Sequence, residues 1–351
     1  MRGDYLKKNL GSHCQVGQNT SKKESVVVKA IVCHQHGGLD TLSLEEITLA
    51  PPQPGQVHIK VRACGINFPD TLQIAGTYQS KTNPPFTPGQ EVAGDVIACG
   101  ADVKHLKPGD RVLATTGTGG YAAEAVAAAE WVTKMPDNMD YATGAGFLIT
   151  YGTSHLALKY RAQLQPGENL LVTGAAGGVG VTAVEIGKLL GARVIAAARG
   201  SGKLATAREL GADETIDYEA EDMRLRVKEL TDGRGADVIY DPVGGDVFDA
   251  AMRCINWEGR ILIIGFASGR IPDAKMNIVL VKNISLVGFA WSTYRDHKPD
   301  LFQESYNELM RWFEEGKLKC HTSKTYPLEN AVQALEDLTA RKTTGKVVLI
   351  P

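Results

Sequence analysis

The sequence lacks three features that would assign it to a special class of protein. No apolar run is long enough to cross a bilayer, because the stretch at 125–131 is short and interrupted by a charge. No charge of one sign dominates, since 38 basic residues face 40 acidic ones, and no basic stripe suggests a nucleic-acid partner. The six cysteines are scattered without the paired spacing of a zinc site or the density of a disulfide scaffold. A reducing, cytoplasmic location therefore fits best.

What remains is the composition of a globular chain of 351 residues, 43% hydrophobic and 22% charged, which is long enough for two domains. Residues 1–25 stand apart, because they are polar, weakly periodic and hold five basic residues against two acidic ones. They indicate a disordered tail. A mitochondrial targeting segment is the alternative, although such segments are usually Arg-rich and poor in acids, whereas this one has a single Arg and an early Asp4.

The body of the chain changes its hydrophobic period near residue 151. Residues 26–151 show short alternating runs such as VVVKAIVC, broken by Pro and Gly, which predict a β-rich domain. Residues 152–297 alternate apolar strand-like runs (NLLVTG, ARVIAAA, ADVIYD, GRILIIG, NISLVGF) with helical stretches, as in a Rossmann-type doubly wound parallel sheet. Residues 298–351 hold two amphipathic helices and the strand KVVLI, which should return to the first domain. The fold class is therefore α/β, and the active site is expected between the domains.

The strongest local motif is LLVTGAAGGVG at 170–180, where an apolar strand ends in a Gly-rich turn that begins a helix. Backbone N–H groups at such a helix start can hold a pyrophosphate, because glycine lets the main chain approach oxygen and the helix dipole favours anions. Ala175 replaces the first glycine of the usual G-x-G-x-x-G pattern. The predicted contacts are Ala176, Gly177, Gly178 and Val179.

The cofactor preference is indicated at the end of the second strand, in ARVIAAARGSGK. An NAD-binding protein normally places Asp or Glu there to bind the ribose hydroxyls, and this sequence has neither. Arg199 and Lys203 follow the strand instead, and cations can pair with a 2′-phosphate that a carboxylate would repel. The sequence therefore favours NADPH.

Four segments together resemble one known family, over residues from about Val27 to Pro351. They are VRACGINFPD at 61–70, PGQEVAGDV at 88–96, KPGDRV at 107–112 and TGAAGGVGVTAVEIGKLLGA at 173–192. Their order and spacing are similar to the quinone oxidoreductase (zeta-crystallin-like) branch of the zinc-independent medium-chain dehydrogenases/reductases. The resemblance implies that the β-rich part is a GroES-like catalytic domain.

The resemblance also implies that zinc is absent. In the zinc-dependent relatives a Cys stands at the position of Asn67 and a His at the position of Gln90, so the thiolate and imidazole ligands are missing here. The four-cysteine lobe that holds a structural zinc in those relatives should be missing too, because only Cys99 lies in the matching stretch. No metal site is expected.

Further contacts with the coenzyme are carried over from the family onto matching positions. Lys203 and Tyr218 match residues that bind the 2′-phosphate, and Arg341 is a weaker candidate. Asn67 and Thr153 match contacts on the nicotinamide side, although either could instead be a turn or cap residue. The segment from Phe266 to Gly269, with Ser268 in it, should border the nicotinamide half.

Three functions are compatible with this pattern. A quinone tolerates electrons well, so a reductase of quinones or related conjugated carbonyls could work with few acids and bases. An enoyl thioester reductase would need a proton donor, and NFPDTLQIAGTY at 67–78 resembles those enzymes, with Tyr78 at the position of their acidic tyrosine. Tyr78 could also simply pack over the site. The third possibility is a crystallin-like protein that binds NADPH with little turnover.

The remaining polar residues near Asn67 are given structural roles. We expect Asp70 to fix its loop by hydrogen bonds and Glu91 to pair with a cation or cap backbone groups. A tyrosine that some relatives carry is Leu72 here, so any role of that hydroxyl is lost. Finally, NISLVGFAW at 283–291 resembles the edge strand through which relatives join two sheets, which predicts a homodimer that acts on a small-molecule electron acceptor.

Overall fold

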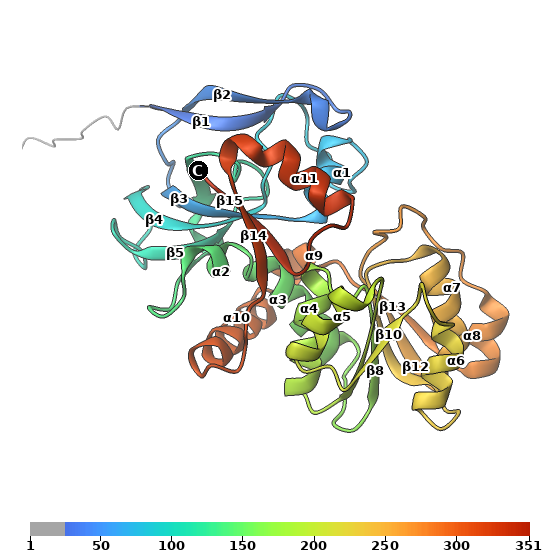
Figure 1. The fold of residues 1–351 in the computed structure, drawn as a ribbon. Coiled ribbons are helices and arrows are strands. Elements are labelled where there is room, and N and C mark those ends of the chain that lie inside the picture. The colour runs from blue at the N-terminus through green and yellow to red at the C-terminus, as the bar shows by residue number, and fades with distance from the viewer. Residues whose placement is uncertain (1–24) are drawn as a thin grey trace, which may run out of the picture.

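The computed structural model describes residues 25–351, so the tail predicted over residues 1–25 lies outside the described residues apart from Ser25. Within that described part no helix combines the length and the apolar character that a membrane span requires. The chain folds into two main sheets with helices around them (Figure 1), which confirms the predicted α/β class.

The first sheet has six parallel strands in the order β10-β9-β8-β11-β12-β13, which is the strand order of a doubly wound dinucleotide-binding sheet. The strand order changes direction between β8 and β11, although the strands stay parallel. The loops at the carboxyl ends of these two strands therefore form the switch point where such folds bind ligands. The sequence predicted five of the strands. The strands are β8 Asn169–Thr173, β9 Arg193–Ala198, β10 Glu214–Asp217, β11 Ala236–Asp241, β12 Ile255–Ile263 and β13 Ser285–Gly288.

Helices cover both faces of this sheet (Figure 1). On one face lie α4 Gly178–Leu189 and α5 Ser201–Glu209, whose buried side chains share a core with the sheet. On the other face lie α6 Met223–Leu230, α7 Gly245–Cys254 and α8 Met276–Lys282. The strands are buried on both sides, which is why the sequence shows them as continuous apolar runs.

The second sheet is mainly antiparallel and is built from both ends of the chain. Its order is β14-β15-β3-β4-β5-β7, and β6 pairs with β3 beside this path. Its strands are β3 Gln56–Ile66, β4 Glu91–Cys99, β5 Arg111–Thr115, β6 Glu124–Ala128, β7 Val132–Lys134, β14 Thr322–Pro327 and β15 Lys346–Ile350. The pairing of β15 with β3 confirms that the strand KVVLI returns to the first part of the chain.

Shorter elements complete this half of the molecule. The strands β1 Val26–Cys33 and β2 Leu42–Leu49 pair with each other, and α11 Ala331–Thr339 lies between them and β15 in the view of Figure 1. The rest are the helices α1 Phe68–Ile74 and α2 Tyr141–Ala145, and the 3-10 turns η1 Leu39–Thr41, η2 Ala129–Trp131 and η4 Leu328–Asn330.

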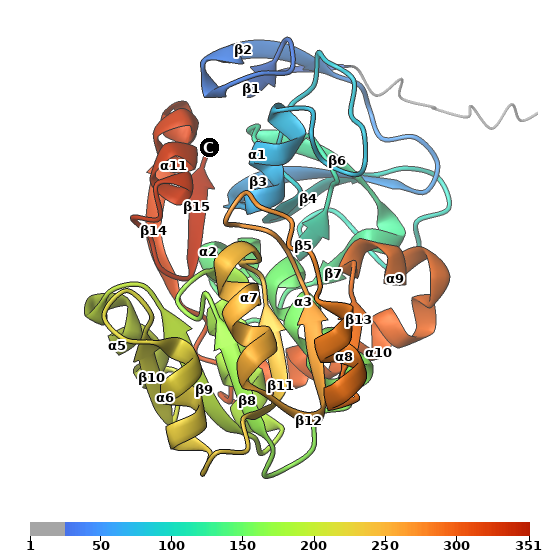
Figure 2. The ribbon, with the colours of Figure 1, turned by 90° about the vertical axis from the view of Figure 1, so that its right-hand side faces the viewer.

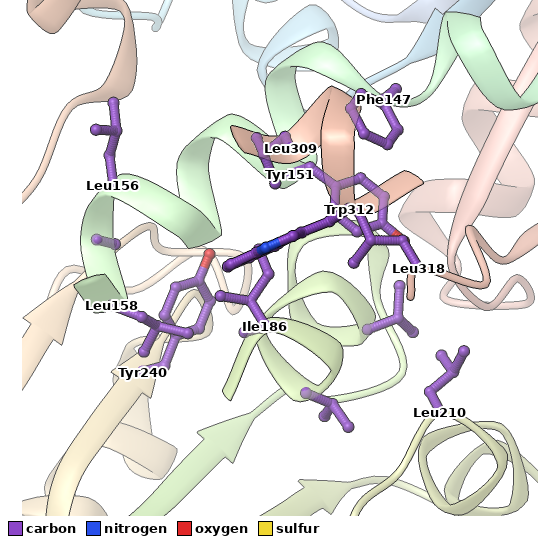
Figure 3. Packing of buried hydrophobic residues seen from close by; sticks show 14 of the residues in the cluster. Phe147, Tyr151, Leu156, Leu158, Ile186, Leu210, Tyr240, Leu309, Trp312 and Leu318 are labelled. Carbon is purple, nitrogen blue, oxygen red and sulfur yellow. The ribbon is translucent and has the colours of Figure 1, made fainter. Parts of the chain in front are cut away.

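The two sheets are joined by a helical layer with one continuous core. Helix α3 Leu148–His155 continues into a π-helical turn, η3 Leu156–Arg161, and packs against α10 Pro299–Glu314, which α9 Trp291–His297 precedes (Figure 2). Figure 3 shows Phe147 and Tyr151 beside Trp312 and Leu309 of α10 and Ile186 of α4. The rings of Phe147 and Tyr151 stack with their centroids 4.6 Å apart. The position of one sheet relative to the other is therefore fixed by apolar packing.

Gly180 lets α4 approach the end of β8 more closely than any other residue would. A Cβ at this position would lie 2.1 Å from the carbonyl oxygen of Gly174 and 2.8 Å from Cα of Ala175. Both atoms belong to the backbone, so no side chain could rotate away. The third glycine of the motif is thus required by helix–strand packing.

We expect Gly180→Ala to lower the free energy of unfolding by on the order of 2 kcal/mol or more, because backbone must shift to admit the methyl group. Gly202→Ala on α5 is the matched control, since a Cβ there meets nothing within 4 Å. That change should be neutral or stabilise by up to about 1 kcal/mol through helix propensity. Thermal and urea unfolding of both variants measure the difference, and equal stability of the two would contradict the packing argument.

Candidate functional site

The Gly-rich turn lies at the switch point of the parallel sheet. Gly177 precedes the first residue of α4, so the first N–H groups of that helix have no partner within the helix. The carbonyl oxygen of Ala176 accepts a hydrogen bond of 2.8 Å from the N–H of Gly345, and Gly177 and Gly345 form a parallel bridge. The turn therefore contacts the segment that leads into β15 of the other sheet, and it forms a cradle suited to an anion.

The loop after β12 lies beside the loop after β11. The N–H groups of Ala267 and Ser268 donate to the carbonyl oxygens of Pro242 and Val243, at 3.0 and 2.9 Å. Phe266 packs on Gly244, where a Cβ would lie 3.1 Å from its ring. The structure thus puts Phe266 and Ser268 at the carboxyl end of the sheet, on the same side as the turn after β8.

Arg199, Lys203, Tyr218 and Arg341 come together beyond the end of β9, although they are distant in the sequence. The guanidinium of Arg199 lies 5.9 Å from the centre of the Tyr218 ring, and Nζ of Lys203 donates to the carbonyl oxygen of Arg341. Burial raises the pKa of the Tyr218 hydroxyl, while the charges of Arg199 and Arg341 act in the opposite direction. Arg341 also donates to the carbonyl oxygen of Ala267 at 3.2 Å. A carboxylate lies here as well, because Nη1 of Arg199 is 3.6 Å from Oε1 of Glu219. Arg199 and Lys203 are thus the cations nearest the end of β9, and they could pair with an anionic group of a ligand.

Between the two sheets, a buried ammonium joins three segments of the chain. Nζ of Lys346 lies 2.9 Å from each of three acceptors, the carbonyl oxygen of Ile66, Oδ1 of Asn67 and Oε1 of Glu91. Lys346, Asn67 and Glu91 are all buried. Glu91 also accepts hydrogen bonds from Nδ2 of Asn67 at 3.0 Å and from the N–H of Ile149 at 3.1 Å. The expectation that Glu91 pairs with a cation and caps backbone is confirmed.

Asp70 holds the loop that carries Asn67. Its Oδ2 accepts the N–H of Asn67 and the hydroxyl of Tyr121, both at 2.8 Å, which confirms its expected structural role. Burial raises the pKa of Asp70 to about 6, although both hydrogen bonds favour the carboxylate. Burial, and to a smaller extent the charge of Asp70, raise the pKa of the Tyr78 hydroxyl. A tyrosine keeps its proton at neutral pH in any case, and the raised pKa makes the Tyr78 hydroxyl a weaker acid than a free tyrosine.

The side chains at the positions of the zinc ligands do not fit a zinc ion. Asn67 offers an amide that is already bonded to a cation and a carboxylate, and Gln90 offers another amide. Within residues 25–351, Nε2 of Gln90 is buried without a hydrogen-bond partner, and no group of three or more His, Cys, Asp or Glu side chains could hold a metal ion. A metal next to the ammonium of Lys346 would also be repelled by it.

Thr153 lies on α3, buried, one turn after Thr150. Thr150 is the nearer of the two to the glycine turn, since its methyl group lies 3.6 Å from where a Cβ of Gly178 would be. A cavity of about 220 Å³ lies farther along the same helix, between its end and α10, and is lined in part by His155 and Ser305. None of the sequence-predicted site residues lines that cavity.

Sequence reasoning did not single out Lys346, and it did not indicate which threonine of α3 lies nearer to the glycine turn. Thr150 differs from the predicted Thr153 by one helical turn, which no sequence pattern resolves. Lys346 begins an apolar strand and resembles a solvated terminal residue. A Lys and a Glu that both lie at strand ends of one sheet can pair, and this was the available signal. The sequence does not show, however, that these two strand ends lie next to each other.

Two family models match the chain. Residues 53–137 match the alcohol dehydrogenase GroES-like domain, and residues 178–315 match the zinc-binding dehydrogenase domain. The second match begins after β8 and covers the other five strands of the parallel sheet, from β9 to β13.

Curated relatives and solved structures agree with these matches. The chain is 42% identical over 328 residues to a quinone oxidoreductase-like protein 2 homolog of Nematostella vectensis, covering 92% of this chain and 88% of the relative. It is 38% identical to the quinone oxidoreductase-like protein 2 of Bos taurus, covering 88% of each chain.

Among structures, the quinone oxidoreductase of Escherichia coli complexed with NADPH is similar, with a TM-score of 0.85 and 32% identity over 92% of this chain and 100% of that one. The quinone oxidoreductase of Pseudomonas syringae has a TM-score of 0.87 and 34% identity, with the same coverage. The chain belongs to the quinone oxidoreductase branch of the medium-chain dehydrogenase/reductase superfamily, and it is an oxidoreductase.

Proposed function

We propose that this protein is an NADPH-dependent reductase of quinones or related conjugated carbonyls that needs no zinc. The observation that carries the proposal is that Arg199 lies over the Tyr218 ring beyond the end of β9, with Lys203 bonded to the Arg341 backbone and the Arg341 charge acting on Tyr218. A 2′-phosphate carries the charge and the acceptor oxygens that this cluster can bind. The related Escherichia coli structure, which is a complex with NADPH, supports the same coenzyme.

The other candidate residues surround the rest of the coenzyme. The N–H groups from Ala176 to Val179 would hold the pyrophosphate at the start of α4. Asn67 and Thr153 would contact the nicotinamide side, and Phe266 and Ser268 would border it. We assign residues 26–151 and 298–351 to the catalytic domain and residues 152–297 to the dinucleotide-binding domain, in a cytoplasmic enzyme.

The side chains between the sheets favour acceptors that need no acid or base from the protein. When bound, NADPH supplies a hydride to the acceptor. Glu91 is already paired with Lys346, and that ammonium already contacts three oxygens, so neither side chain is free to exchange protons. A quinone stabilises the added electrons in its own ring, and stacking against the coenzyme is enough to position it.

A panel of acceptors tested with NADPH and with NADH examines this proposal directly. We expect rapid oxidation of NADPH with simple ortho- and para-quinones, a preference over NADH of at least about tenfold, and no change after treatment with a chelator. Spectrophotometry at the coenzyme's absorption band measures all three. Tight binding of NADPH without reduction of any acceptor would contradict a reductase and favour a protein that only binds the coenzyme.

Enoyl thioesters belong in the same panel, because the half-buried Tyr78 stands at the position of the proton-donating tyrosine of enoyl thioester reductases. The CurK enoyl reductase is a similar structure, with a TM-score of 0.84 and 26% identity over 92% of this chain. In that reaction a hydride adds to the β-carbon, the Tyr78 proton moves to the α-carbon and water returns a proton to the phenolate. Tyr78→Phe should then abolish enoyl reduction while leaving quinone reduction intact. Enoyl reduction that survives this change removes Tyr78 as the acid.

The phosphate cluster gives a prediction about coenzyme selectivity. Lys203→Ala should raise the Kd for NADPH by on the order of 10- to 100-fold and leave the Kd for NADH unchanged, because only NADPH carries the charged partner. Arg208→Ala on the same helix is the matched control, since Arg208 bonds to Thr215 and is exposed. Fluorescence titration measures both constants. Equal weakening of the two coenzymes would argue against a 2′-phosphate site at Lys203.

The edge of the parallel sheet supports a homodimer. β13 is the last strand, and the neighbouring α8 exposes Leu280 and Val281, with 76% and 71% of each residue accessible. Met276 on the same helix is also exposed, and a second copy of the chain would cover this apolar surface. The other side of α8, with the partly buried Ile278 and Val279, packs against the core.

We expect light scattering at micromolar concentration to give the mass of a dimer for the natural protein and of a monomer for Leu280→Glu/Val281→Glu. A charge on each of two apolar contacts must be desolvated for the interface to form, which makes dimerisation unfavourable. Leu225→Glu is the control, because Leu225 is also exposed but lies on α6. A natural protein that is already monomeric at this concentration would refute the dimer.

A further inference from the structure

The side chain of Lys346 runs from the glycine turn to the Asn67 loop through a passage bounded by two glycines. A Cβ on Gly146 would lie 2.8 to 3.1 Å from the methylene groups of Lys346, and a Cβ on Gly178 would lie 3.5 Å from Cδ of Lys346. The stem is therefore enclosed by backbone, and Lys346 is only 5% exposed. Packing alone therefore fixes the position of the Lys346 side chain, apart from any effect of its charge.

The ammonium at the end of this stem has no donor to spare. A lysine ammonium carries three N–H groups, and the three acceptors at 2.9 Å, Ile66 O, Asn67 Oδ1 and Glu91 Oε1, match that number. The carboxylate of Glu91 is equally enclosed, at 1% exposure. The pair is thus a fixed structural unit that cannot deliver a proton without breaking.

This unit fixes the orientation of the Asn67 amide. Oδ1 of Asn67 accepts from the ammonium, and Nδ2 donates to Glu91 at 3.0 Å. A flipped amide would set its NH₂ group against the ammonium and its oxygen against the carboxylate, so both contacts would become repulsive. Asn67 therefore has one allowed orientation, in which its Nδ2 also donates to the carbonyl oxygen of Gly65 at 3.4 Å.

The same strand end is tied to the proposed coenzyme site. The residue before Lys346 donates its N–H to Ala176 in the glycine turn, and Lys346 itself donates its N–H to the carbonyl oxygen of His321 at 3.1 Å. A displacement of the turn would therefore move the base of the Lys346 side chain. One residue connects the turn expected to hold the pyrophosphate with the amide expected to contact the nicotinamide.

We propose that Lys346 is a positioning residue, which holds the Asn67 amide in the orientation that hydride transfer requires and keeps it in register with the glycine turn. This inference rests on the proposed function, because it assumes that Asn67 contacts the nicotinamide side. Lys346 acts through Asn67 and touches neither coenzyme nor acceptor.

A double-mutant cycle tests this inference. Lys346→Met alone would leave Glu91 as an uncompensated buried charge and lower the melting temperature strongly, so the pair is removed together as Lys346→Met/Glu91→Gln. We expect this pair variant to melt close to the natural protein and to bind NADPH with less than about a threefold change in Kd. Its kcat for a quinone should fall on the order of 10- to 100-fold, because a reacting group has lost its alignment.

The cycle is completed in an Asn67→Ala background. If Lys346 acts through Asn67, removing the pair there should lower kcat by less than about twofold further, because the effects of coupled residues are not additive. Full additivity, or an unchanged kcat in the pair variant, would overturn the inference. Lys324→Met/Asp337→Asn is the control, since that pair has the same 2.9 Å separation on the adjacent strand β14 but an exposed lysine, and it should leave kcat unchanged.

The crystal structure of the pair variant separates this inference from the proposed function. If the natural protein reduces no acceptor, the proposed function fails on that result alone. The positioning role is then decided by the Asn67 side chain, which should turn away from its present orientation or occupy two. An unmoved Asn67 in the pair variant would overturn the inference whatever the turnover of the enzyme.

Discussion

The ion pair between Lys346 and Glu91 is the contact on which the site depends. It joins the last strand of the chain to β4, and through Asn67 to the end of β3, in a place where water has been excluded. Breaking such a pair from one side costs about 3–5 kcal/mol, because the remaining charge stays buried. The pair therefore holds together the neighbouring strands β15, β3 and β4 of the antiparallel sheet, and the geometry of the site follows from this constraint.

The parallel sheet contributes the other half of the site through its topology. Because the strand order reverses between β8 and β11, the turn at Gly177 and the loop at Val243 diverge from the same edge. The cations beyond β9 come from three places, the strand end, the first turn of α5 and the loop before β15. Arg341 has a positive φ of 57°, a conformation that non-glycine residues seldom adopt, and it contacts Ala267 from there. A strained residue that brings a cation to a shared spot is typical of a binding site.

Much of this arrangement could be predicted from the sequence, and the rest was hidden for physical reasons. The parallel strands were recognisable because burial on both faces requires continuous apolar runs. β10 was missed because ETID is short and half polar, and it pairs only at the edge of the sheet. Arg199 and Lys203 were predicted, with the family resemblance, to bind a 2′-phosphate, and that role stays a prediction. Lys346 was not predicted, because its partners Glu91 and Asn67 are 255 and 279 residues away. Local patterns carry no information on a pair of that separation.

Under the proposed function the site works without zinc, and a comparison with zinc shows what the Lys346 ammonium does not supply. A zinc ion carries two charges and an open position, so it can polarise a carbonyl oxygen directly. The ammonium of Lys346 carries one charge, and its three donors are used by oxygens of the protein itself. It can stabilise the fold around the site but has no donor to offer a developing alkoxide. Under the proposed function, an acceptor would stabilise the added electrons within its own conjugated system, a condition that simple alcohols and aldehydes do not meet. The contacts that hold the site together would then also narrow the range of substrates.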